Sequence, residues 1–348
     1  MTRKLTLKEC QINKIENIKN KFQQFKLEKN YLALAKLITY SLQRVSEKNN
    51  IPILNNIPSI FRTVEIWLNK ESFQSKDIFI GEPVIYKIYY GNNRQLYGLD
   101  YFYIFCYLKQ NSNELNVYFQ SVNPSYEKLT REDYDLKRNK IGFEGYKSSF
   151  NGDTVSVISV SDPGQFIPNL TSSYYVGSPE LNFPQLIAEV LEKLVNLSNI
   201  SLGDTLLFGS SAGTFGALLT STYLSKKTNV LAVNSQINVA DLRETMQACL
   251  GMDDAEEIMR QFGEQVCCIS RFNGELSAVP NIYILANLND DLYRKNFDFY
   301  KNYIEKFSQK GINNQSVFDS YYGIDGHGRP EPSSLKEKIK LARKILTM

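Results

Sequence analysis

The sequence predicts an α/β protein built on a mostly parallel sheet with helices on both of its faces. From residue 154 onward, short and continuously apolar runs alternate with amphipathic runs of helical spacing. Continuous apolar runs of this length are typical of parallel strands that are buried on both faces. One of these runs passes through a small-residue turn, Gly209 to Gly213, directly into a helix-forming run. In such sheets the functional residues lie at the carboxyl ends of the strands, so we expect the candidate residues there.

The composition bounds the possible functions. The chain has 348 residues, enough for one large α/β domain with an appended region or for two modest domains. Apolar residues make up 43% and charged residues 22% of the chain, and the net charge is +3. This balance is ordinary for a globular protein and does not indicate nucleic-acid binding. The five cysteines form no C-x-x-C pair and there is one histidine, so we expect no metal site and no permanently bound cofactor.

No targeting signal is apparent in the sequence. The first ten residues, M-T-R-K-L-T-L-K-E-C, contain no apolar core before charged residues resume, so we expect no signal peptide. No run approaches the roughly 18 apolar residues of a membrane-spanning helix. These features predict a cytoplasmic protein, either free or peripheral to the inner face of the membrane.

We expect residues 1–150 to form an N-terminal accessory region. Apolar residues spaced three to five apart predict helices over 7–49. Residues 1–50 carry eleven Lys and Arg against four Glu. This excess is typical of a solvated helical surface, and the alternative is a footprint for an anionic polymer or a membrane surface.

The second part of this region changes to aromatic and β-branched residues, which predict antiparallel strands and hairpins. The runs cover 78–80, 84–90, 101–108 and 115–122. Their many tyrosines are expected to pack in the core and across strands, with a sugar-stacking surface as the alternative. The polar, irregular segment 123–150 is the expected boundary.

Residues 151–348 are expected to form the α/β domain that carries the candidate residues. The predicted strands are 155–160, 205–208, 230–233, 282–286 and 316–324, and the predicted helices are 183–197, 215–224, 298–307 and 334–346. An insertion at about 236–279 contains two helical stretches, 239–250 and 255–262. An insertion at this point is typical of a lid that shapes substrate specificity.

The turn from Gly209 to Gly213 has the pattern of a nucleophile elbow. Gly209-x-Ser211-x-Gly213 stands between a predicted strand and a predicted helix, which is the context that gives this short pattern meaning. Side chains at the two glycine positions would collide with the neighbouring strand and helix. The serine hydroxyl is then raised above the sheet edge, and the backbone N–H of Ala212 points to where an oxyanion would form.

A base and an acid follow Ser211 in the order expected for this arrangement. His327 stands between glycines directly after the last predicted strand. Asp290 and Asp291 follow the strand 282–286, and by its spacing from the strand Asp290 is preferred, with Asp291 as the alternative. An acid at this position would orient the imidazole and stabilise its protonated form. Asp325 is a weaker candidate because a residue two positions from the histidine in a tight loop rarely aligns with it.

A second oxyanion donor is expected from the loop after the strand 155–160. We favour the backbone N–H of Gly164, with its neighbours Asp162 and Gln165 as alternatives. Pro163 is excluded because it has no N–H.

The serine, the acid and the histidine stand in the chain order of the α/β-hydrolase superfamily, which the chain resembles from about residue 150 to 346. In this resemblance Ser211, Asp290 (or Asp291) and His327 match the triad positions. The elbow G-S-S-A-G-T-F-G-A-L is similar to that of bacterial glycan and capsule O-acetyltransferases of this fold, including the accessory-Sec glycan O-acetyltransferases. It is also similar to the elbow of esterase-D-like enzymes. The accessory-Sec proteins tend to have Met where this chain has Ala212.

The resemblance implies two-step acyl transfer through an acyl-Ser211 intermediate. Acetyl-CoA is the implied donor and a capsular or surface polysaccharide the implied acceptor, because both are found where a cytoplasmic enzyme works. Capsule synthesis proteins are the further partners this implies, and the basic N-terminal region would suit an anionic polymer or CoA phosphates. The alternatives are a carboxylesterase or carbohydrate deacetylase, and a non-catalytic component of a glycan assembly or export machine.

Overall fold

A computed structural model describes residues 20–21, 24–25, 27–28, 61–68, 74–90, 100–122, 143–150, 154–167, 170–312 and 314–347. The helices expected over 7–49, apart from a few of their residues, and most of the expected boundary segment 123–150 therefore lie outside the described residues. The same holds for most of the basic residues of the first fifty.

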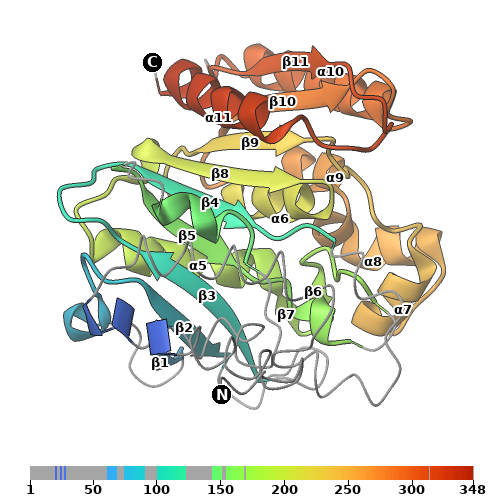
Figure 1. Cartoon of the computed structure of the whole chain (residues 1–348). Helices are drawn as coiled ribbons and strands as arrows, with labels where there is room; N and C mark the ends of the chain where they lie inside the picture. The colour runs from blue at the N-terminus through green and yellow to red at the C-terminus, as the bar shows by residue number, and fades with distance from the viewer. Residues whose placement is uncertain are drawn as a thin grey trace, which may run out of the picture.

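Among the described residues, nine strands form one sheet in the order β1-β2-β3-β5-β4-β8-β9-β10-β11 (Figure 1). Strand β3 runs antiparallel to both of its neighbours, and all other neighbouring strands are parallel. The mostly parallel sheet predicted from the sequence is thus confirmed. The strands are β1 (Arg62–Trp67), β2 (Val84–Tyr89), β3 (Tyr101–Tyr107), β4 (Leu115–Phe119), β5 (Ser156–Val160), β8 (Thr205–Ser210), β9 (Asn229–Val233), β10 (Asn281–Asn287) and β11 (Val317–Tyr321).

The strands before residue 120 belong to this same sheet. Strand β4 lies between β5 and β8, so the expected division at residue 150 falls within one sheet. A hairpin of β3 with β4 does not form, because β5 pairs between them. All five residues of β4 are buried, as suits a central strand with both faces covered. The sheet thus carries β4 directly beside the strand that leads to Ser211.

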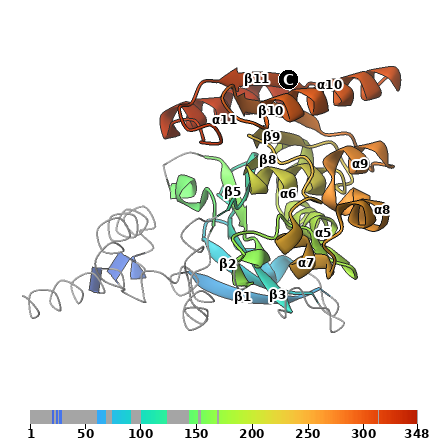
Figure 2. The same ribbon diagram turned by 90° about the vertical axis from the view of Figure 1, so that its right-hand side faces the viewer.

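Helices cover both faces of the sheet (Figure 2). Helices α5 (Phe183–Asn196), α6 (Ala212–Ser221) and α10 (Tyr293–Gln309) share one apolar core. Helix α11 (Pro332–Leu346) and the short 3-10 helix η4 (Tyr146–Phe150) share the core on the opposite face. The other 3-10 helices among the described residues are η2 (Ser75–Asp77), η5 (Pro163–Phe166) and η6 (Leu202–Asp204).

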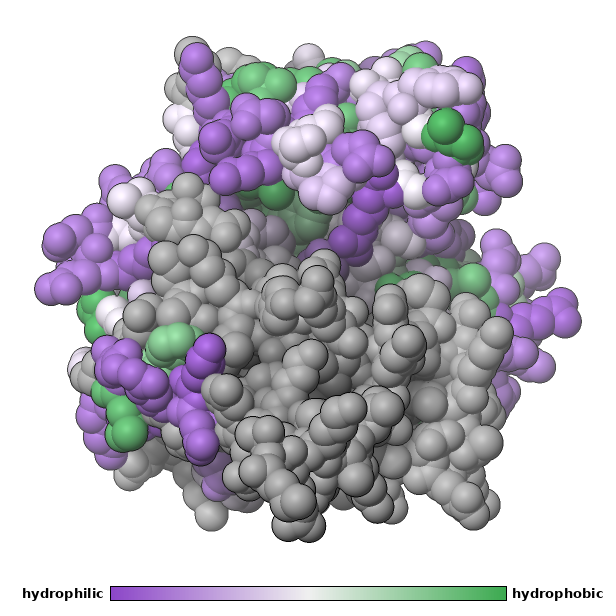
Figure 3. Space-filling model, in the orientation of Figure 1, coloured by the Kyte–Doolittle hydropathy of each residue, from purple (hydrophilic) through white to green (hydrophobic). Residues whose placement is uncertain are grey.

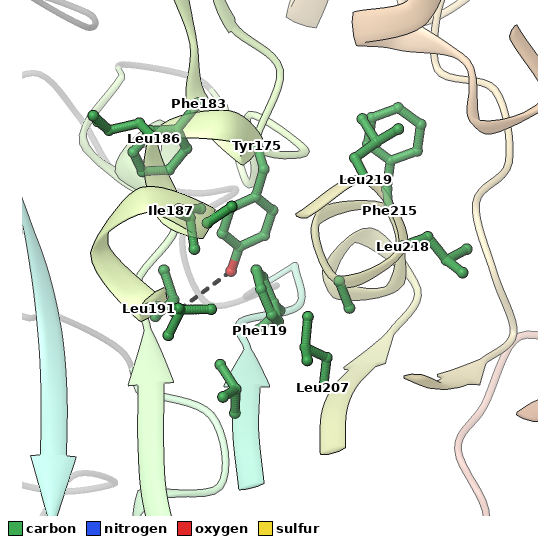
Figure 4. Close-up of a cluster of buried hydrophobic side chains, with 14 of the residues drawn as sticks. Phe119, Tyr175, Phe183, Leu186, Ile187, Leu191, Leu207, Phe215, Leu218 and Leu219 are labelled. Atoms are coloured by element: carbon green, nitrogen blue, oxygen red, sulfur yellow. Dashed lines mark hydrogen bonds between the residues drawn. The ribbon is translucent and has the colours of Figure 1, made fainter. Parts of the chain in front are cut away.

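Helix α5 shows how local sequence builds these layers. Asn182 caps its first turn by accepting a hydrogen bond from the N–H of Gln185, and Pro184 occupies a position where no donor is needed. Its apolar face points at the sheet and at α6 (Figure 4). Each buried Leu or Ile of that face contributes roughly 1.5–3 kcal/mol to stability.

The insertion expected at 236–279 forms helices α7 (Arg243–Leu250), α8 (Ala255–Val266) and α9 (Cys268–Asn273). The start of the insertion is joined to the junction of α8 and α9 by hydrogen bonds from Val239 N–H to Val266 O and from Cys268 N–H to Ile237 O. Helix α9 packs on α6, and α7 and α8 lie toward the end of the molecule to which β8 points (Figure 1). A two-stranded sheet of β6 (Gly177–Ser178) and β7 (Leu181–Asn182) lies close to α7. A role of the insertion as a lid stays a prediction.

Within the described part of the chain, no helix is both long and apolar enough to cross a membrane.

Candidate active site

Ser211 lies in a sharp turn between β8, which ends at Ser210, and α6, which begins at Ala212. Its backbone has φ 52° and ψ −121°, a conformation that costs a residue with a side chain roughly 1–3 kcal/mol. A Cβ atom on Gly209 would collide with the backbone of Gly213, and one on Gly213 would collide with the carbonyl oxygen of Phe119. The small residues of the motif are therefore required by the close approach of α6 to β8 and β4.

His327 links Ser211 to Asp290. Its Nε2 lies 2.8 Å from Ser211 Oγ, and its Nδ1 lies 2.8 Å from Asp290 Oδ2. The Asp290 side chain is 4% exposed and that of His327 is 41% exposed. The carboxylate is thus enclosed, while the imidazole is partly exposed.

The turn after β10 selects between the two candidate acids. Asp290 Oδ1 accepts a hydrogen bond of 2.9 Å from the N–H of Leu292, which fixes the carboxylate with Oδ2 toward the imidazole. Asp291 and Asp325 are exposed. The structure brings Ser211, His327 and Asp290 together and leaves the two alternative acids outside the cluster.

Two buried asparagines hold the loop that carries His327. Asn234 and Asn287 each stand at the end of a strand, β9 and β10 respectively. Asn234 Nδ2 donates to the carbonyl oxygens of His327 (3.3 Å) and Gly328 (3.0 Å). Asn287 Nδ2 donates to Gly326 O at 2.6 Å. Neither asparagine is among the residues predicted from the sequence, although a place directly at a strand end is a signal for both of them.

Arg329 ties the histidine loop to the elbow. Its Nε donates to Ser210 Oγ at 2.9 Å, and its terminal nitrogens bind both carboxylate oxygens of Glu144 at 2.8 and 3.2 Å. Behind this pair lies a cavity of about 960 Å³ between α11 and η4, with Phe208 in its lining. Figure 3 shows a hollow below α11 with apolar side chains in it. Arg329 is likewise not among the residues predicted from the sequence.

The prediction of Gly164 as an oxyanion donor is wrong. Its N–H donates to Asp162 Oδ1 at 2.8 Å within a buried turn, so it is not available to a substrate. The N–H of the alternative residue Asp162 is also occupied, because it donates a hydrogen bond to Gln120 Oε1 at 3.3 Å. Gln165 lies in the same turn, η5, after β5. Strand β5 is separated from β8 by β4, so the loop after it does not adjoin the elbow.

The loop that adjoins the elbow is the one after β4. Tyr118 on β4 and Phe208 on β8 form the last pair of their ladder, and the carbonyls of the next two residues, Phe119 and Gln120, lie against Gly213 of the elbow. The peptide that leads from Gln120 to Ser121 therefore lies beside the elbow. In this fold the second oxyanion donor comes from the loop that follows the neighbouring strand. Ala212, the predicted first donor, is fully buried at the start of α6, where an N–H has no partner within the helix.

The strand order, the strained serine between β8 and α6, and the histidine after the last strand define an α/β-hydrolase fold. No protein-family model matches the sequence, and no curated protein matches it. Among solved structures, the chain is similar to the capsule O-acetyltransferase of Neisseria meningitidis serogroup A, with 18% identity and a TM-score of 0.50 over 73% of this chain and 97% of that chain.

Two further structures are similar to the chain. A mutant of that acetyltransferase in complex with CoA has 18% identity and a TM-score of 0.50, over 72% of this chain and 97% of that chain. A butyrate-bound esterase from Thermogutta terrifontis has 12% identity and a TM-score of 0.43, over 72% of this chain and 92% of that chain. At 18% identity, the likeness to the two acetyltransferase structures shows the fold alone.

Among the residues that the structure describes, no group of three or more His, Cys, Asp and Glu side chains could hold a metal ion.

Proposed function

We propose that this protein is a serine acyltransferase that forms an acetyl-Ser211 intermediate and passes the acetyl group to a hydroxyl of a bacterial surface polysaccharide. The observation that carries the proposal is the continuous hydrogen-bonded chain from Ser211 through His327 to Asp290. Three residues from three separate loops meet in this order only where the fold brings the strand ends together. A binding protein has no need to hold all three in this arrangement.

The proposed first step begins with His327 Nε2 taking the proton of Ser211 Oγ as that oxygen attacks the thioester carbonyl. Asp290 keeps the imidazole in the tautomer with hydrogen on Nδ1 and stabilises the imidazolium that forms. The N–H of Ala212 and the peptide N–H of Ser121 are the proposed donors to the oxyanion. When the tetrahedral intermediate collapses, the C–S bond breaks and the thiol leaves with the proton from His327.

In the second step His327 removes the proton of the acceptor hydroxyl, whose oxygen attacks the acetyl ester of Ser211. The intermediate collapses to release the acetylated sugar and to return the proton to Ser211. The solved structures of the capsule O-acetyltransferase, one of them with CoA, support acetyl-CoA as donor and a capsular polymer as acceptor.

Ester hydrolysis is the second candidate, and the exposure of His327 favours it. An imidazole that is 41% exposed admits water to the acyl-enzyme. Whether water or a sugar hydroxyl accepts the acetyl group depends on how far a bound acceptor excludes water. A carboxylesterase or carbohydrate deacetylase would use the same three residues.

The test is CoA release from acetyl-CoA, measured with and without a panel of capsular oligosaccharides. We expect release that an acceptor stimulates and that Ser211→Ala abolishes. Hydrolysis of a small acetyl ester without acceptor-stimulated release would assign the protein to the esterases. A wild-type protein that is silent in both assays would contradict the proposal and favour a binding or assembly component.

A further inference from the structure

The segment that follows η5 contains two successive residues in a strained conformation. Tyr174 has φ 53° and Tyr175 has φ 61°. Bulky side chains rarely adopt positive φ, and each instance costs roughly 1–3 kcal/mol. Such strain persists only where the surroundings impose it, and it concentrates at functional sites.

Asp162 imposes this conformation. It follows β5, is 2% exposed, and accepts hydrogen bonds from Ser172 Oγ (2.5 Å), Ser173 N–H (2.8 Å), Ser173 Oγ and Gly164 N–H (2.8 Å). Burial raises the pKa of this carboxyl, and the four hydrogen bonds act in the opposite direction. The carboxylate thereby gathers the backbone just before Tyr175 into one compact turn.

Tyr175 turns from this anchor into the core, where it is fully buried (Figure 4). Its ring packs edge-on against Phe119, with centroids 5.4 Å apart, and stacks with Phe183 at 6.1 Å. Gly216 on α6 leaves the space for the ring, because a Cβ atom there would collide with it. The strained backbone therefore places the phenol of Tyr175 in the space between the sheet and α6.

The Tyr175 hydroxyl reaches the carboxyl ends of two strands. It lies 3.1 Å from the carbonyl oxygen of Gln120, after β4, and 3.2 Å from that of Val160, the last residue of β5. Burial raises the pKa of the Tyr175 phenol well above its usual range. The hydroxyl therefore stays protonated, and remains a hydrogen-bond donor, at any pH at which the protein is folded.

A carbonyl held in this way fixes the direction of the next N–H. In a trans peptide the carbonyl of Gln120 and the N–H of Ser121 point in opposite directions. Since the carbonyl faces Tyr175 in the core, the N–H faces away from it. This peptide lies beside the elbow, because Gly213 packs against the carbonyls of Phe119 and Gln120.

We propose that Tyr175 is a positioning residue that holds the Gln120–Ser121 peptide so that the Ser121 N–H serves the oxyanion. The inference rests on the proposed function, since it assumes acyl transfer at Ser211. Tyr175 itself touches no reacting atom. Its hydroxyl acts through one peptide plane, and Asp162 holds the turn that brings the phenol there.

The test is Tyr175→Phe, which removes the hydroxyl and keeps the ring in place. Losing an oxyanion donor outright costs about 10²–10³-fold in kcat, and a donor that is only loosened should cost about 10- to 100-fold. We expect that fall in kcat for acetyl-CoA or p-nitrophenyl acetate, with KM changed less than about twofold, because the donor acts on the transition state. Labelling of Ser211 by a fluorophosphonate, whose phosphoryl oxygen occupies the same site, should slow in parallel.

Tyr86→Phe is the matched control. Tyr86 is also fully buried, and its hydroxyl donates to a backbone carbonyl, Asp77 O, at 2.7 Å, but it stands on β2 away from the elbow. Comparable thermal stability of the two variants, with kcat lowered only in Tyr175→Phe, would support positioning. If Tyr175→Phe does not fold, Ser173→Ala loosens the same turn by removing one hydrogen bond to Asp162, and a smaller fall in kcat at constant KM is expected.

The outcomes separate the two proposals. A wild-type protein in which the fluorophosphonate does not label Ser211 contradicts the proposed function. Labelling of wild type and Tyr175→Phe at equal rates, or a raised KM with unchanged kcat, leaves the proposed function intact and overturns the role of Tyr175. For Ser173→Ala, an unchanged kcat overturns it in the same way.

Discussion

At the scale of single residues, the site depends on one acid among several near neighbours. Asp290 and Asp291 are adjacent in the chain, yet only Asp290 contacts the imidazole, at 2.8 Å. The difference arises in the turn after β10, where the N–H of Leu292 binds one carboxylate oxygen of Asp290. Adjacent residues on a turn point in different directions, so their roles cannot be exchanged.

Asp290→Asn should lower kcat by about 10⁴-fold while leaving the fold intact. The amide keeps the shape of the side chain but favours the wrong imidazole tautomer and no longer stabilises the imidazolium. Steady-state kinetics on acetyl-CoA or p-nitrophenyl acetate measures the effect.

Asp291→Asn is the control for this prediction, since that side chain is exposed and lies outside the cluster. The kcat of Asp291→Asn should stay within about twofold of the wild-type value. Equal losses in the two variants would mean that Asp290 is not the acid of the site.

At the scale of elements, the elbow depends on close packing between α6 and its two strands. Gly213 leaves no room for a side chain because Phe119 O of the neighbouring strand occupies the space. The Cβ position of Gly203, in η6, meets only Ser201 Oγ, at an ordinary 3.5 Å. Gly213 is therefore required by close packing, whereas the position of Gly203 has room for a methyl group.

Gly213→Ala should destabilise the protein by about 2 kcal/mol or more, because either α6 or β4 must shift to admit the methyl group. Gly203→Ala should change the free energy of unfolding by less than about 1 kcal/mol in either direction. Urea denaturation followed by circular dichroism measures both. A Gly213→Ala variant as stable as wild type would contradict the close approach of α6 to β4.

At the scale of the whole molecule, the C-terminal layer is joined to the sheet by Asp319 on the edge strand β11. Its carboxylate accepts hydrogen bonds from Lys338 Nζ on α11, at 2.5 Å, and from Tyr283 on β10. Partial burial acts to raise the pKa of Asp319, but the hydrogen bonds from Lys338, Tyr283 and the Ser320 N–H outweigh it and lower the pKa.

A lowered pKa makes the contribution of Asp319 depend on pH. The carboxylate stabilises the fold above its unfolded pKa of about 3.9, and that stability is lost as the pH falls through the lower folded value. Asp319→Asn should therefore cost about 1 kcal/mol at pH 7, and the difference from wild type should shrink below about pH 4. Unfolding by urea at several pH values tests this. A difference that is independent of pH would assign the effect to packing.

The elbow and the histidine could be predicted from the sequence because their signals are local. Five residues between a strand and a helix predict the position of Ser211, and the one histidine of the chain follows the last predicted strand. The oxyanion loop was misplaced for the opposite reason. Which strand adjoins β8 is a question of sheet order, and no local pattern in 115–122 or 155–160 reports that β4 and β5 exchange places.

The sequence by itself determined the α/β class and the candidate residues Ser211, His327 and the Asp290–Asp291 pair, because periodicity and turn chemistry act over a few neighbouring residues. Only the tertiary structure decided that the early strands complete the same sheet, that Asp290 faces the imidazole, and that Asn234, Asn287 and Arg329 hold the histidine loop. These depend on contacts between residues tens to more than a hundred positions apart. Such contacts are selected by the burial of the whole core, and no segment carries them alone.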